Sequence, residues 1–333
     1  MFHVINALLD GKQQMKPILL ILDDWEGLIQ KADCWTRLKE LVEIKFLAES
    51  INKTSDSEIE QVQFLMALRE RTVLNDEVFK RMPKLKLVLQ TGGHAYHIDT
   101  AAARNRNIVI ALGRQAKAPL FSVPELTFAF ALGLTHKVYD GNESMKKGMW
   151  EPLTGKILSG RRLGILGLGR VGSCVANIAK LAFNMEVVAW GRNEKNYDSG
   201  NFKRLHLDEL MTTSDIISIH LRLSKDSIGL INKERLAKMK PEAILINTSR
   251  GSIVHEKDLI EALKEGKIAG AGLDVFAQEP LAIDSPLRNL SNVILTPHLG
   301  WTVEEVFEEF ADIGCAQLSD YLNDKLAKSE VLC

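Results

Sequence analysis

The chain has 333 residues, of which 46% are hydrophobic and 26% are charged, and its formal net charge at pH 7 is −1. This length exceeds what one hydrophobic core usually supports, so we expect two domains, and the composition excludes a disordered chain. Lysines and arginines are spread along the sequence without a basic face or tail, so we expect no nucleic-acid partner.

The N-terminal segment lacks the basic region and the long apolar run of a signal peptide, and no apolar stretch reaches the length of a membrane span. The cysteines Cys34, Cys174, Cys315 and Cys333 have no paired spacing. This pattern favours reduced thiols over a disulfide framework or a zinc site. We therefore expect a cytoplasmic protein without a membrane partner or a bound metal.

Apolar segments of strand length alternate with helical segments, a pattern typical of parallel βαβ units. We expect two series of strands, and the spacing of the second series matches a doubly wound sheet. The first series is expected at residues 18–22, 42–46, 62–68, 85–90 and 108–110, and the second at 163–166, 186–190, 215–220, 243–248, 269–274 and 293–295.

Two long helices are expected outside these series. Residues 123–139 carry Pro124 and Glu125 at helix-start positions and are apolar nearly all the way round, which indicates a buried helix. Residues 302–322 have helical periodicity after the last strand. This second helix could return to pack on the first domain.

A glycine motif follows the strand at residues 163–166 and opens a helix at 170–183. In such a motif the first glycine permits a tight turn, the second lets the backbone approach a pyrophosphate, and the third lets helix and strand pack closely. Because of this context we favour a dinucleotide site over a mere tight turn. The expected binding residues are Gly167, Gly169, Arg170, Val171 and Gly172.

The end of the next strand bears on the choice of cofactor. NAD sites usually place an acidic residue there to hold the adenosine ribose. Here the strand at 186–190 runs into Gly191, Arg192 and Asn193. Arg192 could pair with a 2′-phosphate, so we predict a preference for NADPH, with NADH still possible. The alternative is that Arg192 is a solvated turn residue.

Three further segments follow strands of the second series, where open α/β sheets place their ligands. Arg250 offers a fixed charge that suits a carboxylate, although a lone arginine is more often an ion-pair partner at the surface. Asp274 could accept a hydrogen bond from a nicotinamide carboxamide. A lone histidine is more often structural, but His298 has Glu279 on the preceding loop, which makes it an acid/base candidate.

In this order, the segments GLGRVG, NTSRG, LDVFAQEP and TPHLG resemble the D-2-hydroxyacid dehydrogenases, with glyoxylate and hydroxypyruvate reductases among the related members. ILDDWEG, LRERT and TGGHAYHID extend the resemblance over nearly the whole chain. It implies an α/β protein of two Rossmann-like, doubly wound domains. A flavodoxin-like substrate domain is expected at residues 1–118 and 301–333, and an inserted NAD(P)-binding domain at 119–300.

The resemblance also implies roles for single residues in the interconversion of a small 2-keto acid and its D-2-hydroxy acid. Arg250 would bind the substrate, His298 would donate the proton, and Glu279 would hydrogen-bond His298 and favour the imidazolium form. Homodimerisation is implied as well. The remaining implied residues are Arg69, Gly92, Gly93, His94 and Trp301 for the substrate, and His220, Thr248, Ser249, Asp274, His298 and Gly300 for the cofactor.

Some features leave alternatives open. Trp301 could narrow the substrate pocket or serve as a core or interface aromatic. His94 and His97 form an HxxH pair, but no third metal ligand accompanies them in the sequence. A dinucleotide-sensing binding module of the same fold is an alternative function, as are dehydrogenases of phosphoglycerate or formate. Formate dehydrogenases pair the histidine with glutamine, so Glu279 argues against that class, although Gln278 is adjacent.

Overall fold

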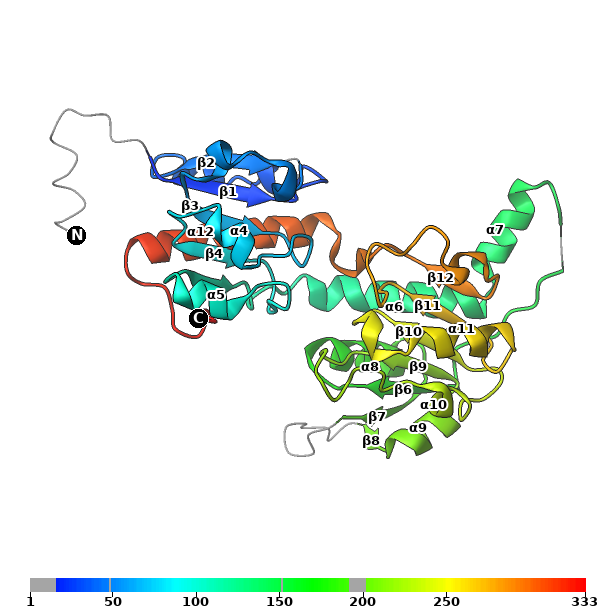
Figure 1. The fold of residues 1–333 in the computed structure, drawn as a ribbon. Coiled ribbons are helices and arrows are strands. Elements are labelled where there is room, and N and C mark those ends of the chain that lie inside the picture. The colour runs from blue at the N-terminus through cyan, green and yellow to red at the C-terminus, as the bar shows by residue number, and fades with distance from the viewer. Residues whose placement is uncertain (1–15, 48, 151, 192–201) are drawn as a thin grey trace, which may run out of the picture. The chain divides into compact units, whose positions relative to one another are not determined.

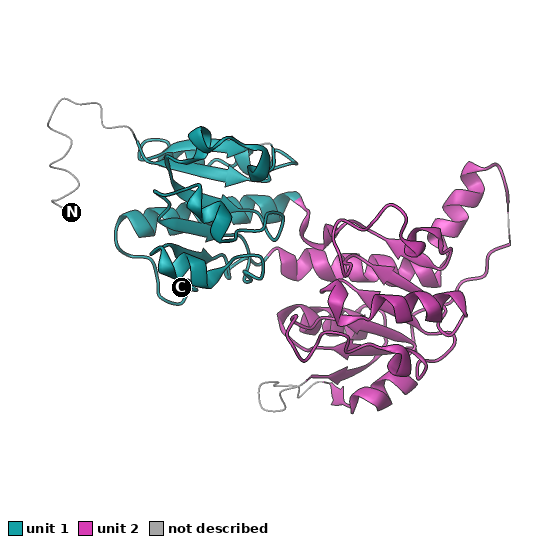
Figure 2. Cartoon of the chain, viewed as in Figure 1, with its two compact units in different colours: residues 1–117, 304–333 teal, residues 118–303 magenta. Residues whose placement is uncertain are grey.

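The computed structural model describes residues 16–47, 49–150, 152–191 and 202–333 (Figure 1). The chain divides into two compact units (Figure 2). Unit 1 comprises residues 1–117 and 304–333, and unit 2 comprises residues 118–303. Each unit is built on one parallel sheet.

Unit 1 contains a five-stranded sheet with the strand order β2-β1-β3-β4-β5. This is the flavodoxin order, in which the strand order reverses between β1 and β3. The central strands are apolar on both faces because helices cover both sides of the sheet. The elements are β1 (Ile18–Leu22), η2 (Ile29–Lys31), α2 (Trp35–Leu38), β2 (Glu43–Leu47), η3 (Ile51–Lys53), α3 (Asp56–Ile59), β3 (Val62–Ala67), α4 (Asp76–Lys80), β4 (Leu87–Gln90), α5 (Thr100–Asn105), β5 (Val109–Leu112) and α12 (Glu304–Leu322).

The last helix, α12, belongs to unit 1, which confirms the expected return of the chain. It packs against β4, α2 and η2 and buries Phe307 and Phe310. The final residues then cover the edge of the sheet, where Val331 pairs with Ala111 in antiparallel orientation. The first domain core is therefore completed by the end of the chain.

The prediction of reduced cysteines was wrong for one pair. Cys34, which precedes α2, and Cys315 on α12 form a disulfide with their Cα atoms 6.3 Å apart. They are 281 residues apart in sequence, and only the return of α12 brings them together. Cys174 and Cys333 are free thiols.

Unit 2 contains a seven-stranded sheet with the order β12-β11-β10-β9-β6-β7-β8. Counted along the unit, this is the dinucleotide-binding order 3-2-1-4-5-6 with a seventh strand added. The elements are α6 (Pro119–Thr135), α7 (Val138–Lys146), β6 (Arg162–Leu166), α8 (Arg170–Leu181), β7 (Glu186–Trp190), β8 (Lys203–Arg204), α9 (Leu207–Thr213), β9 (Ile216–Ile219), α10 (Lys233–Leu236), β10 (Ile244–Asn247), η5 (Gly251–Ile253), α11 (Glu256–Lys264), β11 (Gly270–Leu273), η6 (Pro286–Asn289), β12 (Val293–Leu295) and η7 (Leu299–Trp301).

The predicted strands are all present, with ends within two residues of those expected. Among the described residues the sequence missed β8, a two-residue strand at the sheet edge. The long apolar helix α6 begins at Pro119, so Pro124 lies inside it rather than at its start. It ends at Thr135 because Lys137 takes a left-handed backbone, with φ 57°, and α7 begins after it at Val138. The expected burial holds for only part of α6: seven of its 17 residues are buried and Phe121 is 67% exposed. The helix packs on α8, β10 and β11.

No α-helix in the described parts of the chain combines the length and apolar character that a membrane crossing needs.

Candidate active site

His298 and Glu279 lie within hydrogen-bond distance in unit 2. Nδ1 of His298 is 2.8 Å from Oε2 of Glu279, whose Oε1 accepts the Phe276 N–H at 3.0 Å. Burial opposes ionisation of Glu279, but the hydrogen bond and charge of His298, with the charge of Arg250, outweigh it and lower the pKa of Glu279. A carboxylate bound to Nδ1 fixes the ring orientation and leaves Nε2 for proton exchange.

Asp274 holds the loop that carries the histidine. Its Oδ1 accepts hydrogen bonds from Thr296 Oγ1 at 2.5 Å and from the Leu299 N–H at 2.6 Å, and its Oδ2 accepts the Gly300 N–H at 2.9 Å. Asp274 is only 1% exposed, and burial raises the pKa of its carboxyl group. These bonds flank His298, which has a left-handed backbone with φ 58°. Sequence reasoning missed this supporting role.

Arg250 lies three residues after the end of β10 and immediately before η5. Its Nη1 donates to the Ser249 carbonyl at 2.7 Å, and its own carbonyl accepts from Asn247 Nδ2 at 3.0 Å. The buried Asn247 side chain also accepts the Ser249 N–H at 3.1 Å. One buried amide therefore fixes the backbone on both sides of the arginine.

Gly251 brings the arginine segment against the loop that leads to Glu279. A Cβ added at Gly251 would lie 1.9 Å from the carbonyl carbon of Phe276 and 2.5 Å from the Ala277 nitrogen. Only a glycine permits this approach of two backbones. The sequence contains a glycine directly after Arg250, but the sequence alone gave no reason to assign that glycine a role.

The glycine motif forms a cradle between β6 and α8. Gly167 has φ +100°, and a Cβ there would lie 2.8 Å from the His220 carbonyl oxygen. A Cβ on Gly172 would lie 2.0 Å from the Gly167 oxygen, whereas one on Gly169 would meet nothing within 4 Å. Gly169 caps α8 and has no side chain to cover the first turn, and the N-terminus of a helix attracts an anion. The cradle thus fits a dinucleotide pyrophosphate.

The predicted residues around this cradle lie at ends of neighbouring strands. Thr248 Oγ1 is 3.2 Å from Thr127 Oγ1, and the Ser249 hydroxyl donates to the Leu221 carbonyl. His220 Nε2 is 2.8 Å from Ser218 Oγ, and burial lowers the pKa of His220 to about 4. Parallel strands bring these residues to one edge of the sheet.

Three more of the predicted cofactor residues lie in the described part of unit 2. Arg170 and Val171 open α8, and the Gly300 carbonyl accepts a hydrogen bond from the Ser122 hydroxyl at 2.7 Å. Next to Gly300, the predicted substrate residue Trp301 is buried in unit 2, with 6% of its surface exposed.

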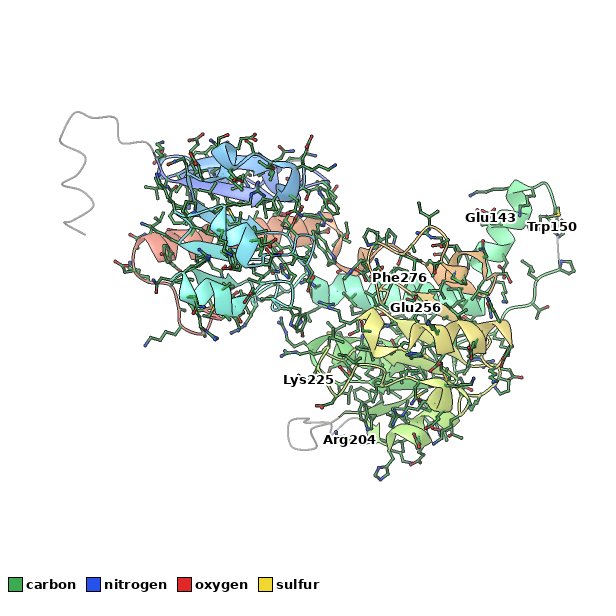
Figure 3. The ribbon with its side chains drawn as sticks, viewed as in Figure 1. Glu143, Trp150, Arg204, Lys225, Glu256 and Phe276 are labelled. Atoms are coloured by element: carbon green, nitrogen blue, oxygen red, sulfur yellow. A yellow bond between two sulfur atoms is a disulfide. The ribbon has the colours of Figure 1, made fainter. Side chains whose placement is uncertain are left out.

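Gly191 is half-buried after β7, whereas Arg192 and Asn193 lie outside the described residues. Arg204 Nη2 donates to the Gly191 carbonyl at 3.3 Å. Figure 3 labels Arg204, a second arginine beside this strand end that sequence reasoning missed because β8 was missed.

The substrate residues predicted in unit 1 lie after β3 and β4. Arg69 has a left-handed backbone with φ 57°, and its guanidinium lies against Gly92. Gly93 is exposed, and His94 stacks on Tyr96 with ring centroids 5.2 Å apart. Within the described residues, no three His, Cys, Asp or Glu side chains are grouped as metal ligands.

The fold and these residues define an NAD(P)-binding α/β oxidoreductase, and comparisons with known proteins agree. The model of the D-isomer specific 2-hydroxyacid dehydrogenase, NAD binding domain, matches residues 128–300. The hydroxypyruvate reductase of Blautia hydrogenotrophica is 32% identical over 315 residues, covering 90% of this chain and 92% of the relative. The glyoxylate reductase of Thermofilum pendens is 35% identical over 264 residues, or 76% of each chain.

Among solved structures, a putative D-3-phosphoglycerate dehydrogenase from Ralstonia solanacearum superposes with a TM-score of 0.84 and 30% identity. The superposition covers 95% of this chain and 97% of that structure. The chain therefore belongs to the D-isomer specific 2-hydroxyacid dehydrogenases, a family of NAD-dependent oxidoreductases that act on small 2-keto and 2-hydroxy acids. The predictions of this family, of the two-domain α/β fold and of the enzyme class are confirmed.

Proposed function

We propose that this chain interconverts a small 2-keto acid and its D-2-hydroxy acid with His298 as the proton donor and acceptor. The observation that carries the proposal is the 2.8 Å contact between His298 Nδ1 and Glu279 Oε2, with the charge of Arg250 acting on the same carboxylate. A carboxylate bound to one ring nitrogen stabilises the imidazolium whose other nitrogen can protonate a ketone.

In the direction of reduction, Arg250 binds the substrate carboxylate and polarises the carbonyl. Bound nicotinamide dinucleotide supplies the hydride. His298 transfers the proton on Nε2 to the carbonyl oxygen, so the imidazolium becomes neutral while the 2-hydroxy acid forms. In oxidation the neutral imidazole accepts the hydroxyl proton. Glu279 is charged in both directions because its pKa is lowered.

For the dinucleotide, we assign the pyrophosphate to the cradle at Gly167, Gly169 and Gly172, with Arg170 and Val171 at the start of α8. The residues assigned to the nicotinamide half are His220, Thr248, Ser249, Asp274, His298 and Gly300. From unit 1 we assign Arg69 and the segment Gly92, Gly93 and His94 to substrate binding. Because Trp301 is buried, its contribution would be to the shape of the loop that carries His298.

The substrate class follows from activity with a panel of acids. Glyoxylate, hydroxypyruvate, pyruvate and bulkier 2-keto acids are each added to enzyme with reduced dinucleotide, and nicotinamide absorbance is followed. We expect turnover with the small acids, since similar chains carry the names hydroxypyruvate and glyoxylate reductase. 3-Phosphohydroxypyruvate tests the phosphoglycerate dehydrogenase alternative. Tight dinucleotide binding without turnover of any acid would favour a sensing module instead.

We also propose that NADPH is preferred over NADH. Two observations support this: β7 is followed by Gly191, which has no carboxylate, and Arg204 donates to the Gly191 carbonyl. Arg192 follows directly in the sequence. Guanidinium groups form charge-assisted hydrogen bonds with a 2′-phosphate, which are stronger than those to the neutral ribose hydroxyl of NADH. Arg204→Gln should lower kcat/KM with NADPH and leave kcat/KM with NADH unchanged; equal losses would contradict this preference.

Finally, we propose that the protein is a homodimer that associates through α7 and the segment after it. This part of unit 2 exposes large apolar side chains: Trp150 is 89% exposed and Ile157 is 67% exposed. Figure 3 labels Trp150, which follows α7. Apolar groups gathered on one exposed segment are typical of an interface. Sedimentation of the native protein and of a Trp150→Ser, Ile157→Ser variant tests this proposal. A dimer that persists in the variant, or a native monomer, would contradict it.

A further inference from the structure

Arg69 has an unusual backbone conformation at the carboxyl end of β3. Its φ is 57°, in the left-handed region that non-glycine residues seldom occupy. Its guanidinium lies against Gly92, where an added Cβ would come within 2.1 Å of Nη1. Gly92 itself has φ +82°, so a side chain there would be excluded by both backbone and space.

The side chains of Gln90, which ends β4, and of Thr91, which follows it, bind both backbone groups of Arg69. Its N–H donates to Thr91 Oγ1 at 2.7 Å, and its carbonyl accepts from Gln90 Nε2 at 3.1 Å. The Thr91 hydroxyl donates in turn to the Ala67 carbonyl at 3.1 Å, which aims an oxygen lone pair at the Arg69 N–H. The peptide units on both sides of Arg69 are therefore fixed by side chains at the end of β4.

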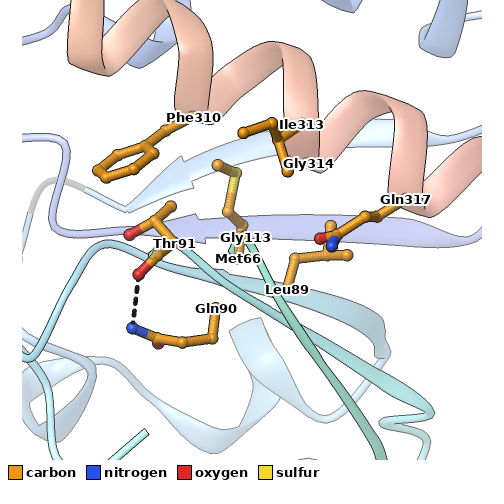
Figure 4. A pocket seen from close by; sticks show the side chains of 9 residues that line it. All are labelled: Met66, Leu89, Gln90, Thr91, Gly113, Phe310, Ile313, Gly314 and Gln317. Carbon is orange, nitrogen blue, oxygen red and sulfur yellow. Dashed lines mark hydrogen bonds between the residues drawn. The ribbon is translucent and has the colours of Figure 1, made fainter. Parts of the chain in front are cut away.

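Gln90 and Thr91 are themselves held firmly. They are 1% and 4% exposed, and Gln90 Nε2 also donates to the Thr91 carbonyl at 2.9 Å (Figure 4). Both line a small cavity in which Phe310 and Ile313 of α12 lie opposite them. Buried hydrogen bonds in apolar surroundings are costly to break, so the two side chains have little freedom to release Arg69.

We propose that Gln90 and Thr91 are positioning residues for substrate binding: by holding Arg69 in the left-handed conformation over Gly92, they present its guanidinium to the anionic 2-keto acid. This inference rests on the substrate role proposed for Arg69. A strained backbone persists only where its surroundings over-determine it, and here both adjacent peptide groups have a dedicated partner. Neither partner needs to touch the substrate.

Thr91→Val tests the inference because it removes the hydroxyl while keeping the side-chain volume. We expect KM for the keto acid to rise about tenfold, because the guanidinium loses its fixed position, while kcat stays within about twofold. Dinucleotide affinity should not change. Thr91→Ser retains the hydroxyl and should restore the KM of the native enzyme. Thr72→Val is the matched control, since it removes another buried hydroxyl from the same unit.

An Arg69→Ala background separates positioning from general damage. There, Thr91→Val should leave KM unchanged, because the group that it positions is gone. An equal rise in KM with and without Arg69 would overturn the inference. If Arg69→Ala raises KM and Thr91→Val does not, the inference fails while the substrate role of Arg69 stands. If Arg69→Ala itself leaves KM unchanged, the proposed substrate role fails first.

Should Thr91→Val not fold, Gln90→Met, which removes the side-chain donor to the Arg69 carbonyl, replaces it with the same expected outcomes.

Discussion

Glu279→Gln removes the carboxylate charge beside His298 while keeping the side-chain volume and a group that can form hydrogen bonds. The His298 side chain is 24% exposed and the Glu279 side chain 36%. The His298 Nδ1 and Glu279 Oε2 atoms are 2.8 Å apart. At that separation even the dielectric constant of water gives an attraction of about 1.5 kcal/mol between imidazolium and carboxylate. A free-energy difference of this size corresponds to roughly a tenfold change in rate.

The assay is kcat for keto acid reduction and for hydroxy acid oxidation, each with saturating dinucleotide. Reduction starts from the imidazolium and oxidation forms it, so kcat in each direction should fall by up to about tenfold in Glu279→Gln. Since the pKa of Glu279 is lowered, the native carboxylate is charged at neutral pH.

Glu256→Gln is the matched control. Glu256 Oε2 accepts the Ala277 N–H at 3.2 Å and so binds the same loop through another carboxylate (Figure 3). Its kcat in both directions should match that of the native enzyme. Native rates in Glu279→Gln, or equal losses of rate in both variants, would refute the assignment of Glu279 as the partner that stabilises imidazolium.

Three further outcomes follow from the structure. Gly251→Ala places a Cβ 1.9 Å from the Phe276 carbonyl carbon, so thermal unfolding should show a loss of about 1–3 kcal/mol together with reduced kcat; native values of both would contradict the close approach. Burial lowers the pKa of His97 to about 4, so between about pH 6.5 and pH 4 the unfolded chain binds a proton there that the folded chain does not. The free energy of unfolding should therefore fall as the pH falls through this range. His97→Asn should flatten this loss in denaturant titrations, and a parallel loss would argue against the buried neutral ring. Reduction of the Cys34–Cys315 disulfide opens a loop of 281 residues and should lower the free energy of unfolding by roughly 3–5 kcal/mol. Calorimetry with and without reductant measures this loss, and in Cys34→Ser the reductant should have no effect.

Much of the fold and of the candidate site could be predicted because parallel strands obey simple rules. Apolar strands separated by helices specify the two sheets, and their carboxyl ends meet at one edge. Arg250, Glu279 and His298 follow different strands of one sheet, and in the structure Glu279 binds His298 directly and feels the charge of Arg250. The sequence order of the strands was therefore enough to group these residues.

What could not be predicted depends on contacts between distant segments. Cys34 and Cys315 meet only because α12 returns to unit 1, so their spacing carries no signal. β8 has two residues and no periodicity to detect. The left-handed backbone of Arg69 is fixed by Thr91, 22 residues further along the chain, and propensity alone would assign it an extended conformation.

The central claim is that His298 transfers the proton, and His298→Ala tests it most directly. The variant should bind NADPH with nearly native affinity in a fluorescence titration, because it loses one contact to the nicotinamide half while the glycine cradle after β6 still binds the pyrophosphate. Adding the preferred 2-keto acid should then give no measurable fall in nicotinamide absorbance. Native turnover by this variant would contradict the claim.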